Sequence, residues 1–247
     1  MDPLGAIVGP ATAIFLLGVF HHHYPTLFAV TLIPSLIAVG LVAFAVKEKE
    51  RKPVAHVSDG EQLRILPSAF RKFLVAVGLF GAGDFAHTLL ILLATQKLAP
   101  ELGATKAASI AVGLYVLHNV FYAGFAFVAG WLADHFHKHL VLASGYALAA
   151  AMALAIIFLP LTVWTLAGIF ILGGVYVAME ETLEDSFCAE LVGEEHHGMA
   201  FGTLATVNGA GDFLSSTIVG TLWTAFGYSA VLFAAGAVLV LKLRPKT

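Results

Sequence analysis

The chain has 247 residues, of which 59% are hydrophobic and only 12% charged, and its mean hydropathy is +0.89. A soluble domain is about 45–50% apolar and about 25% charged, so this composition excludes a water-soluble globule. The formal net charge of −3 gives no reason to expect a polyanionic partner, and the single Cys188 excludes a disulfide framework.

Apolar stretches follow one another along the whole chain. A helix of about 20 apolar residues crosses a hydrocarbon core of roughly 30 Å, so we predict an all-α, polytopic membrane protein with about eight transmembrane helices. In chain order, the expected spans are 3–20, 26–46, 69–95, 107–132, 139–159, 162–190, 199–223 and 227–243.

The polar segment 47–68 separates the second span from the third and reads as a loop. Alternating loops then place 11 of the 13 Lys and Arg residues on one side of the membrane, and only Lys97 and Lys106 on the other. Because basic loops stay in the cytoplasm, we expect the linker and the C-terminus there, in a multi-pass cell (inner) membrane protein.

The fourth and fifth spans are joined by GWLADHFHKH, residues 130–139. In the simplest interpretation, this stretch is an ordinary basic turn that the positive-inside rule keeps in the cytoplasm. It also resembles the signature loop of the major facilitator superfamily, G-x-L-A-D-R-x-G-R-[KR]. Gly130, Leu132, Ala133 and Asp134 match, and Lys138 stands at a basic position. His135, His137 and His139 replace the Arg, the Gly and the second basic residue.

Two further stretches carry the same resemblance. GAIVGPATA in the first span resembles the G-x-x-x-G-P signature of the family's fifth helix, associated with antiporters, at Gly5, Gly9 and Pro10. Generic packing of small residues explains the same letters, since Gly5 and Gly9 share one helix face. Residues 186–227 look like the family's tenth-to-eleventh helix region, where His197 takes the place of an Arg.

The resemblance implies that the chain corresponds to helices five to twelve of a twelve-helix transporter. Residues 1–46 would be the last two helices of the N-terminal bundle, 47–68 the cytoplasmic linker, and 69–247 the six-helix C-terminal bundle. In the family the loop aspartate caps a helix end and pairs with basic groups of a neighbouring helix. Gly130, Asp134 and Lys138 would therefore form a cytoplasmic gate that breaks as the two halves rock.

Several ionisable or polar residues lie within the expected spans. An ionisable residue at bilayer depth costs at least about 2.5–3.5 kcal/mol, so each is a functional candidate. The candidates for binding substrate or protons are Asp84, His87, His118, Asn119, Glu180, Glu181, Asn208 and Asp212.

The middle of each expected span lacks Lys and Arg, which leaves His, Asn, Ser and backbone as partners for these acids. Three interpretations stay open: some acids hold a proton, the cavity binds cations, or the acids are neutral packing elements. Glu184 and Asp185 lie nearer the end of their span, and we expect them to be solvated. His196 and His197, beside Glu194 and Glu195, are expected on the solvated surface as well.

The function that fits best is secondary active transport of a small solute by alternating access, coupled to protons and more often efflux than uptake. No zinc-type ligand spacing, nucleotide loop or Ser–His–Asp set is present, so we expect no enzyme activity, cofactor, bound metal or nucleic-acid partner. One alternative is a truncated or partner-dependent protein that does not transport, lacking the first four helices. The other is a metal-cation carrier that uses the run His21, His22 and His23.

Overall fold

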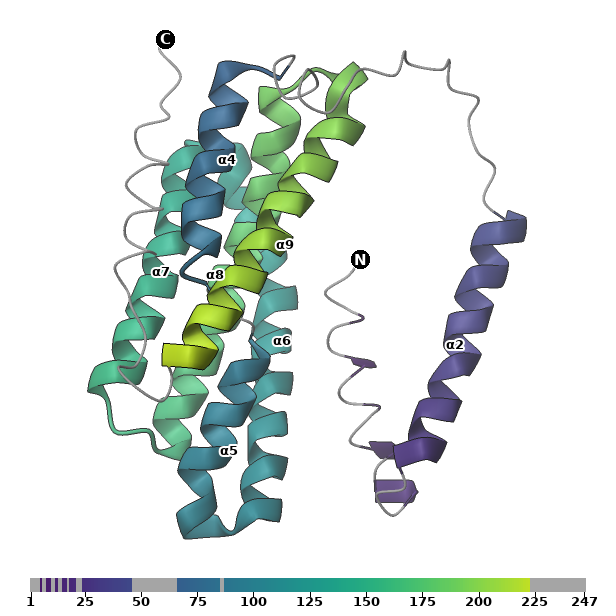
Figure 1. Ribbon diagram of the computed structural model, residues 1–247, viewed down its shortest axis with the longest axis vertical. Coiled ribbons are helices and arrows are strands. Elements are labelled where there is room, and N and C mark those ends of the chain that lie inside the picture. Colours follow the sequence, from purple (N-terminus) through teal and green to yellow (C-terminus); the bar gives the residue numbers. More distant parts are fainter. Residues whose placement is uncertain are drawn as a thin grey trace. The chain divides into compact units, whose positions relative to one another are not determined.

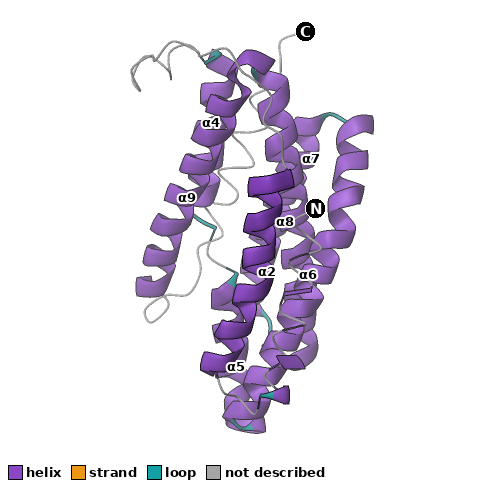
Figure 2. Cartoon of the chain, turned by 90° about the vertical axis from the view of Figure 1, so that its right-hand side faces the viewer, coloured by secondary structure: helices purple, strands orange, loops and turns teal. Residues whose placement is uncertain are grey.

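The computed structural model is built from α-helices, and no strand occurs in the part of the chain that it describes (Figure 2). It describes residues 5, 8, 9, 12, 15, 16, 18–20, 24–45, 66–84 and 87–222. The chain divides into two compact units, Met1–Ser58 and Asp59–Thr247, so the boundary falls within the predicted linker. The assignment of these units to two bundles of one transporter stays a prediction.

Helices occupy most of the predicted spans, with ends within a few residues of the expected ones. The first unit contains α2 (Tyr24–Ala45), which accommodates Pro34. The predicted spans 3–20 and 227–243 lie outside the continuously described residues. The second unit contains α4 (Ser68–Gly81), α5 (Thr88–Leu102), α6 (Ala104–His135), α7 (Lys138–Phe158), α8 (Val163–Leu191), a short 3₁₀ turn (Glu194–His196) and α9 (His197–Leu222).

The prediction of one continuous helix over 69–95 is wrong. α4 ends at Gly81, and α5 begins only at Thr88. The last turn of α4 tightens, because the backbone N–H groups of Gly83 and Asp84 both donate to the carbonyl of Phe80. Glycine is a poor helix former, and the sequence Gly81-Ala82-Gly83 therefore favours a break at this point. The break leaves Asp84 outside regular helix.

α8 is the centre of the second unit: α6 and α7 both pack along it, and α5 packs on α6 (Figure 1). Glycines allow the closest approach. A Cβ atom added at Gly174 of α8 would lie 2.2 Å from the carbonyl oxygen of His118 in α6. α7 approaches α8 at Gly145, where a Cβ atom would lie 3.1 Å from Cβ of Met179. The long α8 is therefore held against two neighbours by backbone-level contacts.

α4 packs mainly on α9, and a pair of glycines marks their crossing. A Cβ atom added at Gly211 would lie 2.9 Å from Cα of Gly81. Since Gly81 is also the last residue of α4, the crossing fixes the end of α4 beside the middle of α9. At the far end of the unit, Gly103 with φ +81° forms the single-residue turn between α5 and α6.

Among the described residues, α6, α7 and α8 are long and apolar enough to cross a membrane. Large apolar side chains cover their outer surface, including Phe127, Phe158 and Trp164, which is 86% exposed. Lipid solvates such a surface where water does not, so the chain is a multi-pass membrane protein.

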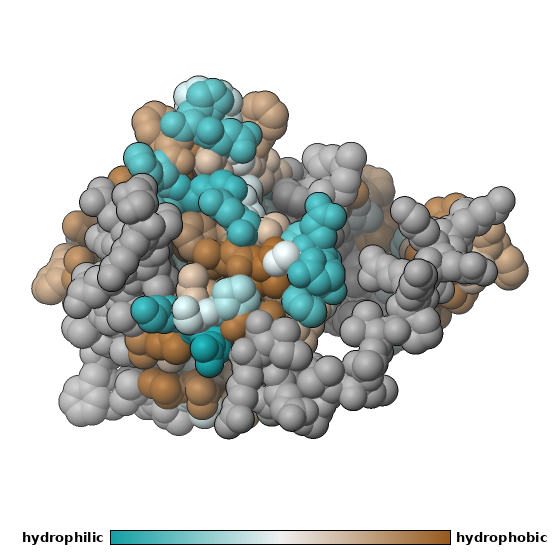
Figure 3. Space-filling model, turned by 90° about the horizontal axis from the view of Figure 1, so that it is seen from above, coloured by the Kyte–Doolittle hydropathy of each residue, from teal (hydrophilic) through white to brown (hydrophobic). Residues whose placement is uncertain are grey.

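The two ends of the second unit differ in their basic residues. Arg71 and Lys72 lie near the start of α4, and Lys138 begins α7, which starts at the same end of the unit (Figure 1). Lys97 and Lys106 flank the turn between α5 and α6 at the opposite end. Figure 3 looks onto the end where α4 begins, where hydrophilic residues surround an apolar centre.

Candidate functional site

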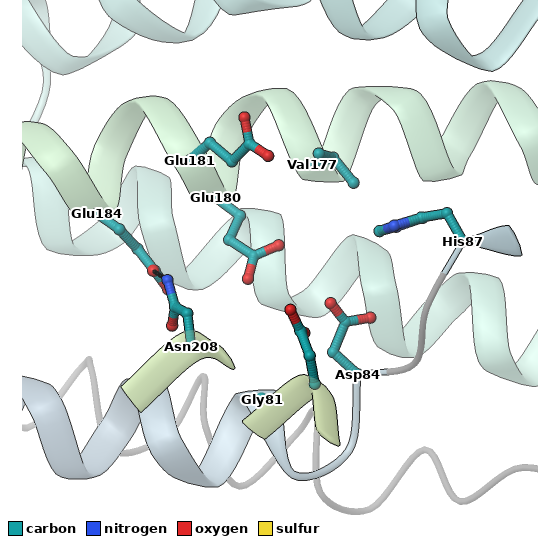
Figure 4. A pocket seen from close by; sticks show the side chains of 9 residues that line it. Gly81, Asp84, His87, Val177, Glu180, Glu181, Glu184 and Asn208 are labelled. Atoms are coloured by element: carbon teal, nitrogen blue, oxygen red, sulfur yellow. Dashed lines mark hydrogen bonds between the residues drawn. The ribbon is translucent and has the colours of Figure 1, made fainter. Parts of the chain in front are cut away.

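A cavity of about 260 Å³ lies where α4 breaks beside α8 and α9 (Figure 4). Carboxyl groups dominate its wall, and none of the described residues that line it is a Lys or an Arg. Its lining residues are Gly81, Asp84, His87, Val177, Glu180, Glu181, Glu184, Asn208 and Asp212. An anionic wall without a matching cation can accommodate protons or a positively charged solute.

Asp84 and His87 meet at Tyr176 of α8. The Tyr176 hydroxyl donates to Oδ1 of Asp84 over 2.7 Å, and Nε2 of His87 lies 2.6 Å from the same hydroxyl. Tyr176 is fully buried and Asp84 is 6% exposed. Asp84 and His87 therefore stand on either side of the break and are joined through a third residue.

Two other acids of the cavity also receive a tyrosine hydroxyl. Tyr146 of α7 donates to Oε1 of Glu184 over 2.5 Å, and Nδ2 of Asn208 donates to the other carboxylate oxygen over 2.9 Å. Tyr122 of α6 donates to Glu181. Glu184 is only 1% exposed, so the expectation that it is solvated is wrong, whereas Asp185 is exposed as expected.

Glu180 and Asp212 complete the carboxylate set. Glu180 projects from α8 toward Asp84 (Figure 4), and Asp212 belongs to α9. Within the described part of the chain, no hydrogen bond reaches the side chain of either residue. Asp84, Glu181 and Glu184 thus have hydroxyl donors, while Glu180 and Asp212 present carboxyl groups that can accept a proton or a cation.

His118 and Asn119 do not line this cavity, which differs from the sequence-based expectation. Both side chains are buried in α6. Nδ1 of His118 lies 3.2 Å from the carbonyl oxygen of Phe170, and Nδ2 of Asn119 donates to the carbonyl of Tyr115. The His118 ring nevertheless lies near His87, with ring centroids 5.1 Å apart. His118 therefore stands behind the cavity wall.

Comparison with known proteins identifies the family. The Major Facilitator Superfamily matches residues 1–211 of the chain. The chain belongs to the major facilitator superfamily. It is also 24% identical over 245 residues to an uncharacterized MFS-type transporter of Methanocaldococcus jannaschii, across 97% of this chain and 61% of that protein. The chain thus spans less than two thirds of the length of this relative.

Residues 130–139, which resemble the superfamily signature loop, form the connection between α6 and α7. Asp134 lies in the last turn of α6, and His137, the residue before α7, makes no capping bond. The expectation that Asp134 caps a helix is therefore not met among the described contacts. Lys138 instead forms an ion pair with Glu190 near the end of α8, over 2.9 Å. Gly130 faces α8, where an added Cβ atom would lie 3.9 Å from Cγ2 of Thr182.

His197 closes the end of α8 while it stays partly exposed, so it lies at the surface as expected but also makes hydrogen bonds to the backbone. Its Nε2 lies 3.0 Å from the carbonyl oxygen of Val192 and 3.2 Å from that of Ala189. The last carbonyl groups of a helix need such donors. The imidazole of His197 therefore acts as a cap for the end of α8.

The remaining predicted features either lie outside the described residues or make no contact among them. Pro10 and the run His21, His22 and His23 lie outside the described residues. An added Cβ atom at Gly5 or Gly9 would meet no described atom within 4 Å. Among described residues, no group of three or more His, Cys, Asp or Glu converges as metal ligands.

The tyrosines are the part of the site that sequence reasoning missed. His, Asn, Ser and backbone were the expected partners of the acids, whereas Tyr122, Tyr146 and Tyr176 supply hydroxyl groups from three helices. One signal was present within α8 itself: Tyr176 precedes Glu180 by four residues, as Glu180 precedes Glu184. Residues at this spacing share a helix face.

Proposed function

We propose that the protein moves a small, positively charged solute across the cell membrane by alternating access, in exchange for protons. The observation that carries this proposal is the carboxyl-lined cavity at the break between α4 and α5. Membership of a transporter family supports transport, and the anionic wall supports a cationic cargo. The resemblance of residues 5–10 to the antiporter signature favours efflux.

Protons fit this cavity because its acids have neutral partners. A carboxylate at bilayer depth is costly, and Asp84, Glu181 and Glu184 each accept hydrogen bonds from hydroxyl or amide groups, which carry no charge. Each acid is stable with a proton and can release it when a cation arrives. Asp84, His87, Glu180, Glu181, Asn208 and Asp212 would hold cargo or protons, with Glu184 added from the structure and His118 and Asn119 behind them.

Proton release on addition of a cation tests this function. The full-length transporter is reconstituted into liposomes that enclose a pH-sensitive dye and are acid inside. Tetraethylammonium, ethidium and putrescine are then added in turn from outside. At least one of them is expected to alkalinise the lumen faster than it does in protein-free liposomes. If every cation gave the protein-free rate, proton–cation exchange would be rejected.

The orientation of the chain is a separate prediction. We expect the turn between α5 and α6 outside and the linker inside, because the basic residues are distributed so unequally between the two faces. Single cysteines at positions 55 and 99, in a background where Cys188 is replaced, are treated with an impermeant maleimide on intact cells. Labelling at 99 and protection at 55 are expected. The reverse pattern would invert the topology.

The gate prediction concerns the pair formed by Lys138 and Glu190. If the ion pair holds the cytoplasmic ends of α7 and α8 together in one state, Lys138→Glu and Glu190→Lys should each slow transport. The double charge swap should restore most of the rate, because it restores the attraction. Both side chains are partly exposed, so the expected effect on stability is below about 1 kcal/mol. A double swap as slow as the single variants would remove this pair from the gate.

A further inference from the structure

Three titratable side chains form a continuous hydrogen-bonded chain across the helix break. Asp84 follows α4, His87 precedes α5, and Tyr176 of α8 touches both. Because the Tyr176 hydroxyl donates to the Asp84 carboxyl, its oxygen lone pair can accept the Nε2–H of His87. While Asp84 is ionised, His87 thus donates to Tyr176 and Tyr176 donates to Asp84.

The geometry points to a proton relay in which Tyr176 passes a proton between His87 and the cavity acid Asp84. This inference rests on the proposed proton-coupled function and adds a residue and a route to it. In the step toward the cavity, an imidazolium at His87 gives its Nε2 proton to the Tyr176 oxygen. At the same time, the hydroxyl proton of Tyr176 passes to Oδ1 of Asp84. One N–H and one O–H bond break, two O–H bonds form, and tyrosine is regenerated as His87 and Asp84 become neutral.

The groups around the relay give it a direction. His118 of α6 does not line the cavity but lies near His87, and its Nδ1 lies 3.2 Å from the carbonyl oxygen of Phe170, nearer the start of α8. On the cavity side, Glu180 of α8 and Asp212 of α9 line the same wall as Asp84. The relay therefore lies between a pair of imidazoles on one side and the open carboxyl groups on the other.

Tyr146 provides a matched comparison within the same unit. It is also fully buried and donates to a carboxylate of the cavity, that of Glu184. Its hydroxyl has no histidine partner among the described residues, in contrast to that of Tyr176. A relay through Tyr176 should therefore disappear in Tyr176→Phe and survive in Tyr146→Phe, although both variants remove one buried hydroxyl group.

The test follows the protonation of His87 by ¹⁵N NMR of the full-length transporter labelled at histidine, without gradient or cargo. The His87 signal is identified by its loss in His87→Gln. In the wild-type protein and in Tyr146→Phe, we expect Asp84→Asn to displace the pH midpoint of His87 by about one pH unit, as for strongly coupled sites. In Tyr176→Phe, the same Asp84 substitution should displace the midpoint clearly less, because only the interaction through space remains.

Two results would overturn the relay. One is an equal displacement with and without the Tyr176 hydroxyl, which would mean that Asp84 acts on His87 only through space. The other is a wild-type His87 that keeps one charge and tautomer from roughly pH 4 to pH 9, because it would have no mobile proton to pass. The transport proposal can fail independently of the relay. In that case, cation transport would not depend on a pH gradient, even though NMR still showed coupling between His87 and Asp84.

Discussion

Replacing Gly174 by alanine is expected to unfold or severely weaken the second unit. The added Cβ atom would lie 2.2 Å from the carbonyl oxygen of His118 and 3.0 Å from the backbone nitrogen of Tyr122. Both atoms belong to the backbone of α6 and cannot move without displacing that helix. Overpacking typically costs about 1–3 kcal/mol, and a clash with backbone places this variant at or above the upper end. Thermal unfolding of the purified protein in detergent measures the loss.

Gly168 is the control for this experiment because it lies in the same helix. An added Cβ atom there meets no described atom within 4 Å. Gly168→Ala should therefore be neutral, or stabilising by up to about 1 kcal/mol through the better helix propensity of alanine. If both alanine variants melted at the wild-type temperature, the close contact between α6 and α8 would be wrong.

Replacing Asp84 by asparagine is expected to abolish gradient-driven transport while leaving exchange of cargo intact. Asparagine keeps the size of the side chain and an oxygen that can accept from Tyr176, but it cannot carry a proton. Asp84 lines the cavity and is 6% exposed, so its ionisation depends on what enters the cavity. Transport driven by a pH gradient should fall to the rate of protein-free liposomes, while exchange of labelled for unlabelled cation continues.

Asp212→Asn separates coupling from packing. Asp212 lines the same cavity from α9, but its side chain is more exposed and no described hydroxyl group donates to it. If Asp212 is a second proton site, its variant should share the loss of driven transport. If it only binds cargo, its variant should weaken exchange as well. Should both asparagine variants transport uphill at the wild-type rate, these acids would be structural.

The helices themselves were largely predictable from sequence. α6, α7, α8 and α9 lie where long apolar runs predict them, because a membrane requires each span to satisfy its own backbone hydrogen bonds. The break after Gly81 was not predicted, because the whole apolar run is long enough to span a membrane and its hydropathy gives no sign of an interruption in the helix. Hydropathy averages over some 19 residues and cannot register a turn such as Gly81-Ala82-Gly83.

The site was partly predictable for a related reason. A charged residue in an apolar run stands out in any sequence, and six of the residues predicted on that ground line the cavity: Asp84, His87, Glu180, Glu181, Asn208 and Asp212. Tyr122, Tyr146 and Tyr176 do not stand out, because tyrosine is common in apolar runs. The hydrogen-bond partner of each hydroxyl group lies far away in sequence and cannot be identified from the sequence alone. The pairing of Lys138 with Glu190 is hidden in the same way, since it joins the start of α7 to the end of α8, far apart in sequence.

The most direct test of the account is uphill movement of a cation under an imposed pH gradient. The full-length transporter is reconstituted with an acidic lumen and an equal concentration of radiolabelled tetraethylammonium on both sides, so that no chemical gradient of the cation exists. Tetraethylammonium carries a permanent charge and is not trapped by acid in the way that an amine is. The account predicts that the cation accumulates in the lumen as protons leave, and that Asp84→Asn abolishes this accumulation. Equal concentrations on both sides throughout, with the label still exchanging across the membrane, would contradict proton coupling through the carboxyl-lined cavity.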